Sequence, residues 1–216
     1  ISKNNALGII NIISNVEKIA YGTRNFVETH NFSLEELNNY QKRIVEKNSE
    51  IYGSSICFEP YEADSTQKLY SIFYYKQNND IKFSDLSSED YHYPEKDWYK
   101  IPKKQNQAMW SEPYYDEGGG DILMTTFSVP FYRISPNGKV LRGIITCDLS
   151  LSFLKEYISK NQLIENSYAF VISKQGKFLA HPDTSIIMKK DLFDISNDKK
   201  IPELAILGKR MLNGEE

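Results

Sequence analysis

Apolar side chains recur every three or four positions along the first part of the chain, with polar side chains between them. This period predicts one amphipathic helix over residues 2–29, and the positions that define it are Ile9, Ile12, Ile13, Val16, Ile19, Ala20, Phe26 and Val27. At a rise of about 1.5 Å per residue the helix is roughly 40 Å long, longer than one small domain needs. We therefore expect residues 1–32 to form a spine that runs past two domains. Ser33 and Glu36 then have the spacing of a capping box, which predicts a second helix over residues 34–47.

The period next changes to that of β-strands. Residues 51–58 and 69–75 are rich in β-branched and aromatic side chains, and the turn-forming residues between them indicate a hairpin. Two further candidates, residues 122–132 and 139–149, are joined by the sequence SPNG, which is typical of a tight turn. Because short loops can join only antiparallel neighbours, the four strands predict an antiparallel sheet.

The last part of the chain repeats this order on a smaller scale. An amphipathic helix is predicted over residues 150–161, a hairpin over 167–182 with its turn at 174–176, and a final helix over 202–212. A lone hairpin is barely stable in water. We therefore expect this unit to pack against the spine and to need further strands that this sequence does not contain. The sequence thus predicts an α+β chain with a spine at 1–32, a sheet domain at 33–162 and a smaller, incomplete domain at 163–216.

Composition narrows the class of protein. The chain has 216 residues, of which 26 are basic and 29 acidic, and a net charge of -3 without a basic stripe argues against nucleic acid as a partner. No run approaches the ~18 apolar residues of a membrane span, and the N-terminus lacks the layout of a signal peptide. Since the first residue is isoleucine, we expect a piece of a longer protein. The two cysteines, Cys57 and Cys147, lie in apolar strand-like runs, which favours buried hydrophobic positions over a single disulfide bridge.

Few residues support catalysis or a cofactor. The triple glycine at residues 118–120 is followed by Asp121, not by the Lys and Ser or Thr of a phosphate-binding loop, so it favours a turn. Asp116, Glu117 and Asp121 do not have the spacing of a calcium loop, and we favour a solvated acidic turn. The three histidines are far apart, and the chain has no GxSxG elbow. We therefore expect neither an enzyme, nor a bound metal, nor another cofactor.

The stretch YHYPEKDWYKIPKKQNQAMWSEPYYDEGGGD, residues 91–121, contains five tyrosines and both tryptophans. A long connection without clear period is often functional, and such aromatic side chains either line a small-ligand pocket or belong to the core. We favour the pocket. A second signal is Asp148, which follows Ile144 and Thr146 on one face of an otherwise apolar strand. A buried carboxylate is costly unless it is paired, so Asp148 indicates either a cationic ligand or a charge at a helix N-terminus.

Three segments carry a resemblance to a known family: DWY followed by WSEPYYD, the strand TTFSVPFY, and GIITCDLSL running into a helix. Over residues 1–195 the chain resembles the double Cache domain, the tandem PAS-like extracytoplasmic sensor of prokaryotic histidine kinases and chemoreceptors. The resemblance implies two PAS-like domains, a location outside the cytoplasm of a membrane protein, and flanking transmembrane helices. The apolar stripe of the first helix fits either a homodimer or packing between domains.

Many members of this family bind free amino acids, and the spacing of their motif falls here on Tyr91, Lys96, Trp98, Tyr99, Tyr114 and Asp148. The resemblance implies that the cation and tryptophan side holds a ligand carboxylate and that the later tyrosine and aspartate hold its ammonium. Lys96 stands where the family has arginine, and lysine cannot make the planar two-bond clasp with a carboxylate. We therefore expect a small charged ligand, which is an amino acid, an amine or a small carboxylate. The alternative is an interaction module that senses a partner protein.

Overall fold

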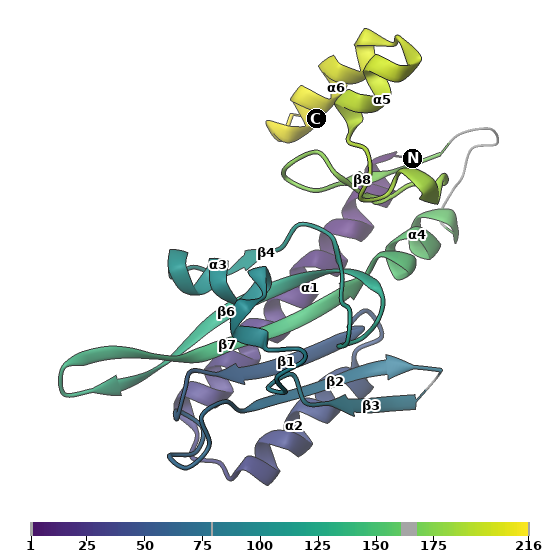
Figure 1. Ribbon diagram of the computed structural model, residues 1–216. Helices are drawn as coiled ribbons and strands as arrows, with labels where there is room; N and C mark the ends of the chain where they lie inside the picture. Colours follow the sequence, from purple (N-terminus) through teal and green to yellow (C-terminus); the bar gives the residue numbers. More distant parts are fainter. Residues whose placement is uncertain (1, 79, 161–167, 216) are drawn as a thin grey trace. The chain divides into compact units, whose positions relative to one another are not determined.

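The computed structural model describes residues 2–78, 80–160 and 168–215 (Figure 1). The chain divides into two compact units. The first unit comprises Ile10–Ser111 and Tyr115–Ser150, and the second comprises Ile1–Ile9, Glu112–Tyr114 and Leu151–Glu216.

The two N-terminal helices form where the apolar period predicts them. Helix α1 is Ser2–Thr29 and helix α2 is Leu34–Lys47. The capping box is also present, since the Ser33 hydroxyl accepts from the Glu36 backbone N–H at 3.1 Å and the Glu36 carboxylate accepts from the Ser33 N–H at 2.8 Å. These bonds satisfy backbone donors that the first turn of a helix would otherwise leave unpaired.

The first unit is built on an antiparallel sheet whose order is β3-β2-β1-β7-β6-β4, with β5 paired to β6 beside this path. The prediction of a helix pair followed by an antiparallel sheet is confirmed. The two long strands β6 and β7 are longer than predicted, and the edge strand β3 was not predicted. The strands are β1 (Gly53–Phe58), β2 (Ser71–Gln77), β3 (Asp80–Ser84), β4 (Met109–Trp110), β5 (Tyr114–Tyr115), β6 (Leu123–Ser135) and β7 (Gly138–Ser150).

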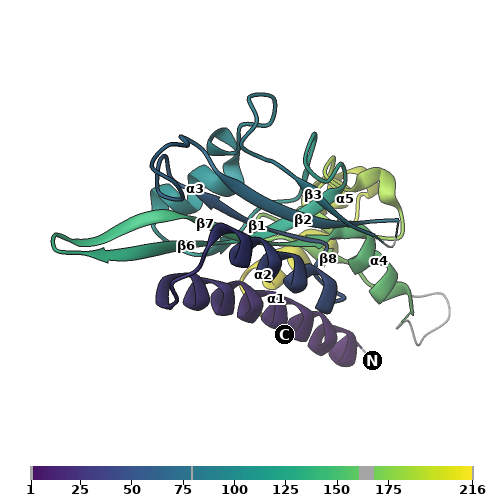
Figure 2. The same cartoon turned by 90° about the horizontal axis from the view of Figure 1, so that it is seen from below.

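One face of this sheet holds the main apolar core. Helices α1 and α2 lie side by side on this face, and helix α3 (Asp97–Gln105) lies on the other (Figure 2). Burial of these side chains supplies most of the stabilisation, at about 25 cal/mol per Å² of apolar area. The core on the α1 and α2 side contains Val16, Ala20, Val27, Leu37, Val45, Ile51, Ile56, Phe58, Ile72, Phe127, Val129, Phe131, Ile145 and Cys147.

The connection between β3 and β6 is more regular than the sequence suggested. It contains a short 3-10 helix η1 (Tyr93–Glu95) and helix α3, so the prediction of an irregular connection is wrong for this part. Trp98, Tyr99 and Pro102 form the buried side of α3. The helix escaped prediction because it has only nine residues, and because its aromatic residues and Pro102 are poor helix signals.

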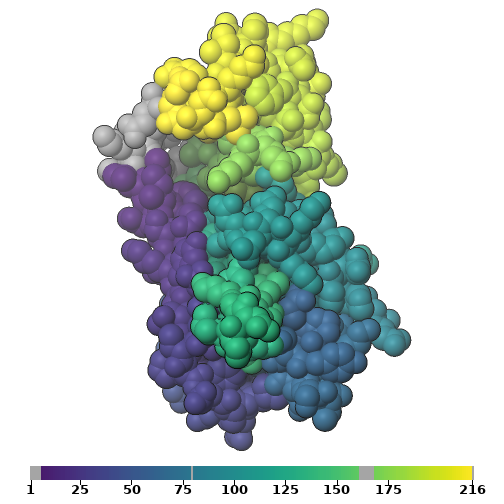
Figure 3. Space-filling model, turned by 90° about the vertical axis from the view of Figure 1, so that its left-hand side faces the viewer, coloured from purple at the N-terminus to yellow at the C-terminus, as the bar shows by residue number. Residues whose placement is uncertain are grey.

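The β6–β7 hairpin extends past the neighbouring strands (Figure 1), and Figure 3 looks at its end, drawn in green. Arg133 joins this part of the hairpin to the β1–β2 loop through two bonds to the Glu62 carboxylate, at 3.0 and 3.1 Å. Gly143 has a φ of +157° and lies so close to β1 that an added Cβ would be 2.1 Å from the Cys57 carbonyl oxygen. A glycine is therefore required at this position of β7.

Both cysteines are buried and carry free thiols, as the apolar surroundings in the sequence favoured. Cys57 is opposite Ile144 in the β1–β7 ladder and Cys147 is opposite Ser54, so the two thiols lie on opposite faces of the sheet. A bridge between them would require the strands to be rearranged.

The second unit contains the predicted final helix and the predicted hairpin, whose turn lies at residues 174–176. Helix α5 was not predicted, because its capping box uses Asp191 and Asp194 in place of the usual Ser or Thr with Glu. Part of the predicted segment 150–182 lies outside the described residues, at 161–167. The elements are α4 (Leu151–Lys160), β8 (Val171–Ile172), β9 (Phe178–Ala180), η2 (Thr184–Ile186), α5 (Leu192–Lys199) and α6 (Pro202–Leu212). Within the described ranges, no helix combines the length and apolar character that a membrane crossing requires.

Candidate ligand-binding site

The face of the first sheet that looks away from α1 and α2 is polar at its centre. In the ladders Asp148 is opposite Thr126, and Thr146 is opposite Ser55 and Ser128. These five side chains are each 2% exposed or less. The predicted alternation, with Asp148 and Thr146 on one face and Cys147 on the other, is therefore confirmed. A buried polar surface of this kind is costly to a fold unless its groups find partners.

Asp148 is the charged residue of this polar face. The Thr126 hydroxyl donates to its Oδ1 at 2.8 Å. Burial first, and then the negative charge of Asp116, raise the pKa of Asp148 well above its usual value, while hydrogen bonds from Thr126 and Thr146 act in the opposite direction. Among the described residues, the groups that shift this pKa include no cation. Asp148 lies within β7, three residues before α4 begins, and its side chain is bonded inside the sheet. These contacts do not support a charge at the N-terminus of α4.

A second buried carboxylate was missed by the sequence interpretation. Asp116 is 3% exposed, so the prediction of a solvated acidic turn is wrong for this residue. Tyr91 donates its hydroxyl proton to Asp116 Oδ1 at 2.5 Å, and the Gly120 N–H donates to Oδ2 at 2.7 Å. The indole Nε1–H of Trp98 donates to the Tyr91 hydroxyl at 3.3 Å. Burial raises the pKa of Asp116, and it also raises the pKa of Tyr91, which keeps the phenol a donor.

The triple glycine allows the chain to wrap around Asp116. An added Cβ at Gly119 would lie 2.2 Å from Asp116 Oδ2, and one at Gly120 would lie 2.8 Å from the Tyr52 ring. Of the three glycines, Gly118 alone has a positive φ, +77°. The predicted turn is present, but close approach explains two of its glycines better than backbone freedom does.

Lys96 is the cation of this cluster. Its Nζ lies 4.1 Å from the centroid of the Tyr91 ring, and its charge lowers the pKa of Asp116. Tyr91, Lys96 and Trp98 are thus brought together as predicted from the resemblance, and Asp148 acts electrostatically on the pKa of both Tyr91 and Tyr52.

The other predicted residues differ in their surroundings. Tyr99 donates its hydroxyl to the Glu59 carboxylate at 2.7 Å, so its polar end is held by the protein. Tyr114 is half-buried in β5, which pairs with β6. Trp110 turns to the helix face of the sheet, where its ring packs 5.3 Å from that of Phe127. The aromatic stretch therefore contributes to both the polar face and the core, and the prediction that it lines a pocket does not hold for Trp110.

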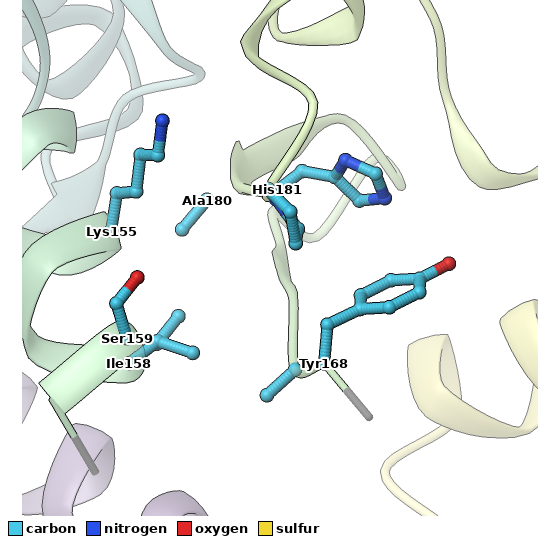
Figure 4. A pocket seen from close by; sticks show the side chains of 8 residues that line it. Lys155, Ile158, Ser159, Tyr168, Ala180 and His181 are labelled. Atoms are coloured by element: carbon cyan, nitrogen blue, oxygen red, sulfur yellow. The ribbon is translucent and has the colours of Figure 1, made fainter. Parts of the chain in front are cut away.

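Two hollows lie on the described part of the second unit. In the smaller one, Lys155 and Ser159 of α4 lie on one side of the opening, and Tyr168 and His181 lie on the other with their rings directed away from α4 (Figure 4). Its volume is about 20 Å³, which is room for about one water molecule. An organic ligand does not fit in this space.

The larger hollow has a volume of about 430 Å³ and is lined by Lys189, Lys190, Lys199 and His181 among others. Lys190 is already paired with Asp198 at 2.5 Å. Within the described part of the chain, the buried side-chain atoms without a hydrogen-bond partner belong to Gln41, Ser128 and Arg142, and all three residues lie in the first unit. Of these residues, Ser128 lies on the polar face that also carries the buried Asp148, so this face of the first sheet is the stronger candidate for a ligand site.

Comparison with known proteins identifies the class. The chain belongs to the family of methyl-accepting chemotaxis protein-like first PDC sensor domains, whose family model matches residues 37–156. This match covers the whole polar face, and it confirms the resemblance to Cache-type sensor domains. The protein is a sensor domain of the kind found in chemoreceptors and histidine kinases.

Individual relatives agree with this family. The chemotaxis protein McpC of Bacillus subtilis is 31% identical over 117 residues, which are 52% of this chain and 17% of McpC. The extracellular domain of a protein described as a histidine kinase, soHK1S-Z6, is 25% identical with a TM-score of 0.75, over 93% of this chain and 76% of that domain. This chain thus matches less than a fifth of the length of the curated relative.

The chemoreceptor PctB of Pseudomonas aeruginosa is similar in both sequence and structure. It is 30% identical over 106 residues, which are 49% of this chain and 16% of PctB. Its ligand-binding domain, solved in complex with L-Gln, has a TM-score of 0.55 and 20% identity over 90% of this chain and 69% of that domain.

Proposed function

We propose that this chain is the extracytoplasmic sensor module of a transmembrane signal transducer, and that it binds a small ammonium-bearing molecule on the polar face of its first sheet. The observation that carries the proposal is Asp148. It is a buried carboxylate whose electrostatic surroundings, among the described residues, contain another acid and no cation. A ligand ammonium placed beside Asp148 would supply the missing opposite charge.

The remaining residues support this assignment. Thr126 and Thr146 hold the Asp148 carboxylate on the polar face, and Tyr91, Lys96 and Trp98 form a cluster at its side. The predicted roles of Tyr99 and Tyr114 stay predictions from the family motif. PctB, which was solved with L-Gln, makes amino acids and their amine relatives the first ligands to test.

The chain would act by binding and not by turnover. A ligand that binds a closed arrangement of the polar face more tightly than an open one shifts the balance between the two. The size of the signal is then limited by this difference in affinity. Transmembrane helices in the full-length protein would carry the shift to a cytoplasmic output domain, a kinase or a chemoreceptor signalling domain.

A thermal-shift screen against amino acids, amines and small carboxylates tests the proposal. A ligand at a hundred times its Kd stabilises the folded state by about 2.7 kcal/mol, which raises the Tm of a domain of this size by roughly 5–10 °C. Asp148→Asn keeps the shape of the side chain and should abolish the shift. Glu117→Gln, an exposed acid next to the buried Asp116, is the matched control and should keep the shift. Full binding by Asp148→Asn would show that the site lies elsewhere.

A further inference from the structure

The hydrogen-bond donors of Trp98 and Tyr91 are already used by the protein. The indole of Trp98 has a single donor, and it is directed to the Tyr91 hydroxyl. The Tyr91 hydroxyl has one proton, and it is directed to Asp116. A ligand carboxylate needs donors, so neither Trp98 nor Tyr91 can serve it while Asp116 holds this chain of bonds.

The acceptors of the site are less committed. The Ser128 hydroxyl is 1% exposed and has no hydrogen-bond partner within the described residues. It lies on the same face as Thr126 and Asp148, two residues along β6 from Thr126. Because a buried polar atom without a partner is costly, Ser128 independently indicates a polar ligand group on this face, and its lone pairs can accept from an ammonium.

The charges of the site point to the same class of ligand. Asp116 and Asp148 are buried carboxylates, and the half-buried Lys96 acts on Asp116 but is not among the groups that shift the pKa of Asp148. With both acids ionised, two negative charges and one positive charge leave a net charge of -1. A zwitterionic amino acid adds no net charge, whereas a monovalent amine brings the buried total to zero.

We infer that this site selects organic amines that lack a carboxylate over the corresponding amino acids. This inference rests on the proposed function, because it specifies the ligand class of the same site. Asp116 is the residue that sets the preference: it fixes the direction of the Tyr91 and Trp98 donors and adds the second negative charge. Lys96, which lies over the face of the Tyr91 ring, is the remaining group for a carboxylate, and as a lysine it binds one less firmly than an arginine would.

The inference is tested by isothermal titration calorimetry with pairs of compounds that differ only in the carboxylate. Suitable pairs, in which the amine carries one positive charge at neutral pH and the amino acid carries no net charge, are tyramine with tyrosine, isobutylamine with valine, and histamine with histidine. In the pair that binds, the amine is expected to bind at least tenfold more tightly. If the amino acid binds more tightly, this inference is overturned while the proposed function stands. If no compound of either kind binds, the proposed function itself fails.

Two variants test the part played by Asp116. Asp116→Asn removes one negative charge and should reduce the preference for the amine at least tenfold. Tyr91→Phe keeps the ring under Lys96 but frees the Trp98 donor, so it should reduce the ratio of amine affinity to amino-acid affinity. This variant tests the inference even if Asp116→Asn does not fold. Glu117→Gln removes an exposed acid from the same loop and should leave the ratio of the two affinities unchanged. An unchanged ratio in the folded Tyr91→Phe variant would overturn the role of this hydrogen-bond chain.

Discussion

At the scale of single residues, the two buried acids differ in what surrounds them. Asp116 has bonds to both oxygens, from Tyr91 and Gly120, and it feels the positive charge of Lys96. Asp148 has hydroxyl donors but no cation within the described residues, and its pKa is raised further from its usual value. The partners of Asp116 are thus supplied by the protein itself, whereas Asp148 lacks, among the described residues, a cation that a ligand could supply.

A prediction about stability follows from Asp148. Its pKa is raised in the folded state, so the unfolded chain loses this proton at a lower pH, near 4. The free energy of unfolding contributed by Asp148 is therefore greatest below pH 4 and falls as the pH rises through the folded-state pKa. Asp148→Asn removes this loss and should raise the Tm of the ligand-free domain by a few degrees at pH 8.

The measurement is thermal unfolding of the parent and the variant between pH 4 and pH 8. The difference in Tm should grow with pH, and the same variant should lose ligand binding. Glu117→Gln should show no such trend, because Glu117 is exposed. A variant that is less stable than the parent at pH 8 would mean that the ionised carboxylate supports the fold without any ligand.

At the scale of elements, the sequence predicted the helices whose signals lie in residues close to one another along the chain. The apolar period of α1 and the Ser33 capping box of α2 depend only on residues that are close in sequence. Both helices have the predicted bounds. Helix α3 and strand β3 were missed, since α3 is short and aromatic, and β3 is a five-residue edge strand without a buried side. Their form depends on the sheet that they pack against.

The residues of the candidate site also fall into some that the sequence predicted and one that it missed. Alternation along β7 placed Asp148 on the correct face, and the family spacing pointed to the cluster of Tyr91, Lys96 and Trp98. Asp116 was not recognised, because its burial depends on a loop that folds back across the sheet and not on a periodic pattern. The triple glycine close behind Asp116 was the available signal, since consecutive small residues permit such a close approach.

This loop gives a prediction at the element scale. Gly119→Ala would place a Cβ 2.2 Å from Asp116 Oδ2, so either the carboxylate or the loop must move. We expect a loss of about 1–3 kcal/mol in stability from overpacking and at least a tenfold loss of ligand affinity. Thermal unfolding and calorimetric titration measure the two effects.

The matched glycine substitution is Gly22→Ala in α1, where no atom lies within 4 Å of an added Cβ. Alanine is the better helix former, so this variant should be about 0.5–1 kcal/mol more stable and should bind as the parent does. Equal affinities for Gly119→Ala and the parent would show that the loop position does not govern binding.

At the scale of the whole molecule, a sensor domain must pass a small change at its site to distant parts of a longer protein. Helix α1 is the longest element and its residues belong to both units, so it is suited to this task. Three large apolar side chains on α1 are exposed: Leu7 at 48%, Ile10 at 54% and Tyr21 at 39%. At about 100° per residue they fall within roughly 60° of one another around the helix, and they form one apolar stripe.

We predict that this stripe of Leu7, Ile10 and Tyr21 associates with its copy in a second chain, because exposed apolar residues aligned on one helix face are typical of interfaces. Sedimentation equilibrium should then show a concentration-dependent dimer, and Ile10→Glu should shift it at least tenfold toward the monomer. Ile134→Glu is the control, since Ile134 is 78% exposed near the tip of the β6–β7 hairpin, away from α1 in sequence and in element. The prediction is contradicted if Ile134→Glu weakens the dimer as much as Ile10→Glu does, or if the parent stays monomeric at high protein concentration. In either case α1 packs only within its own chain, and a ligand-induced change must pass along α1 without a partner helix.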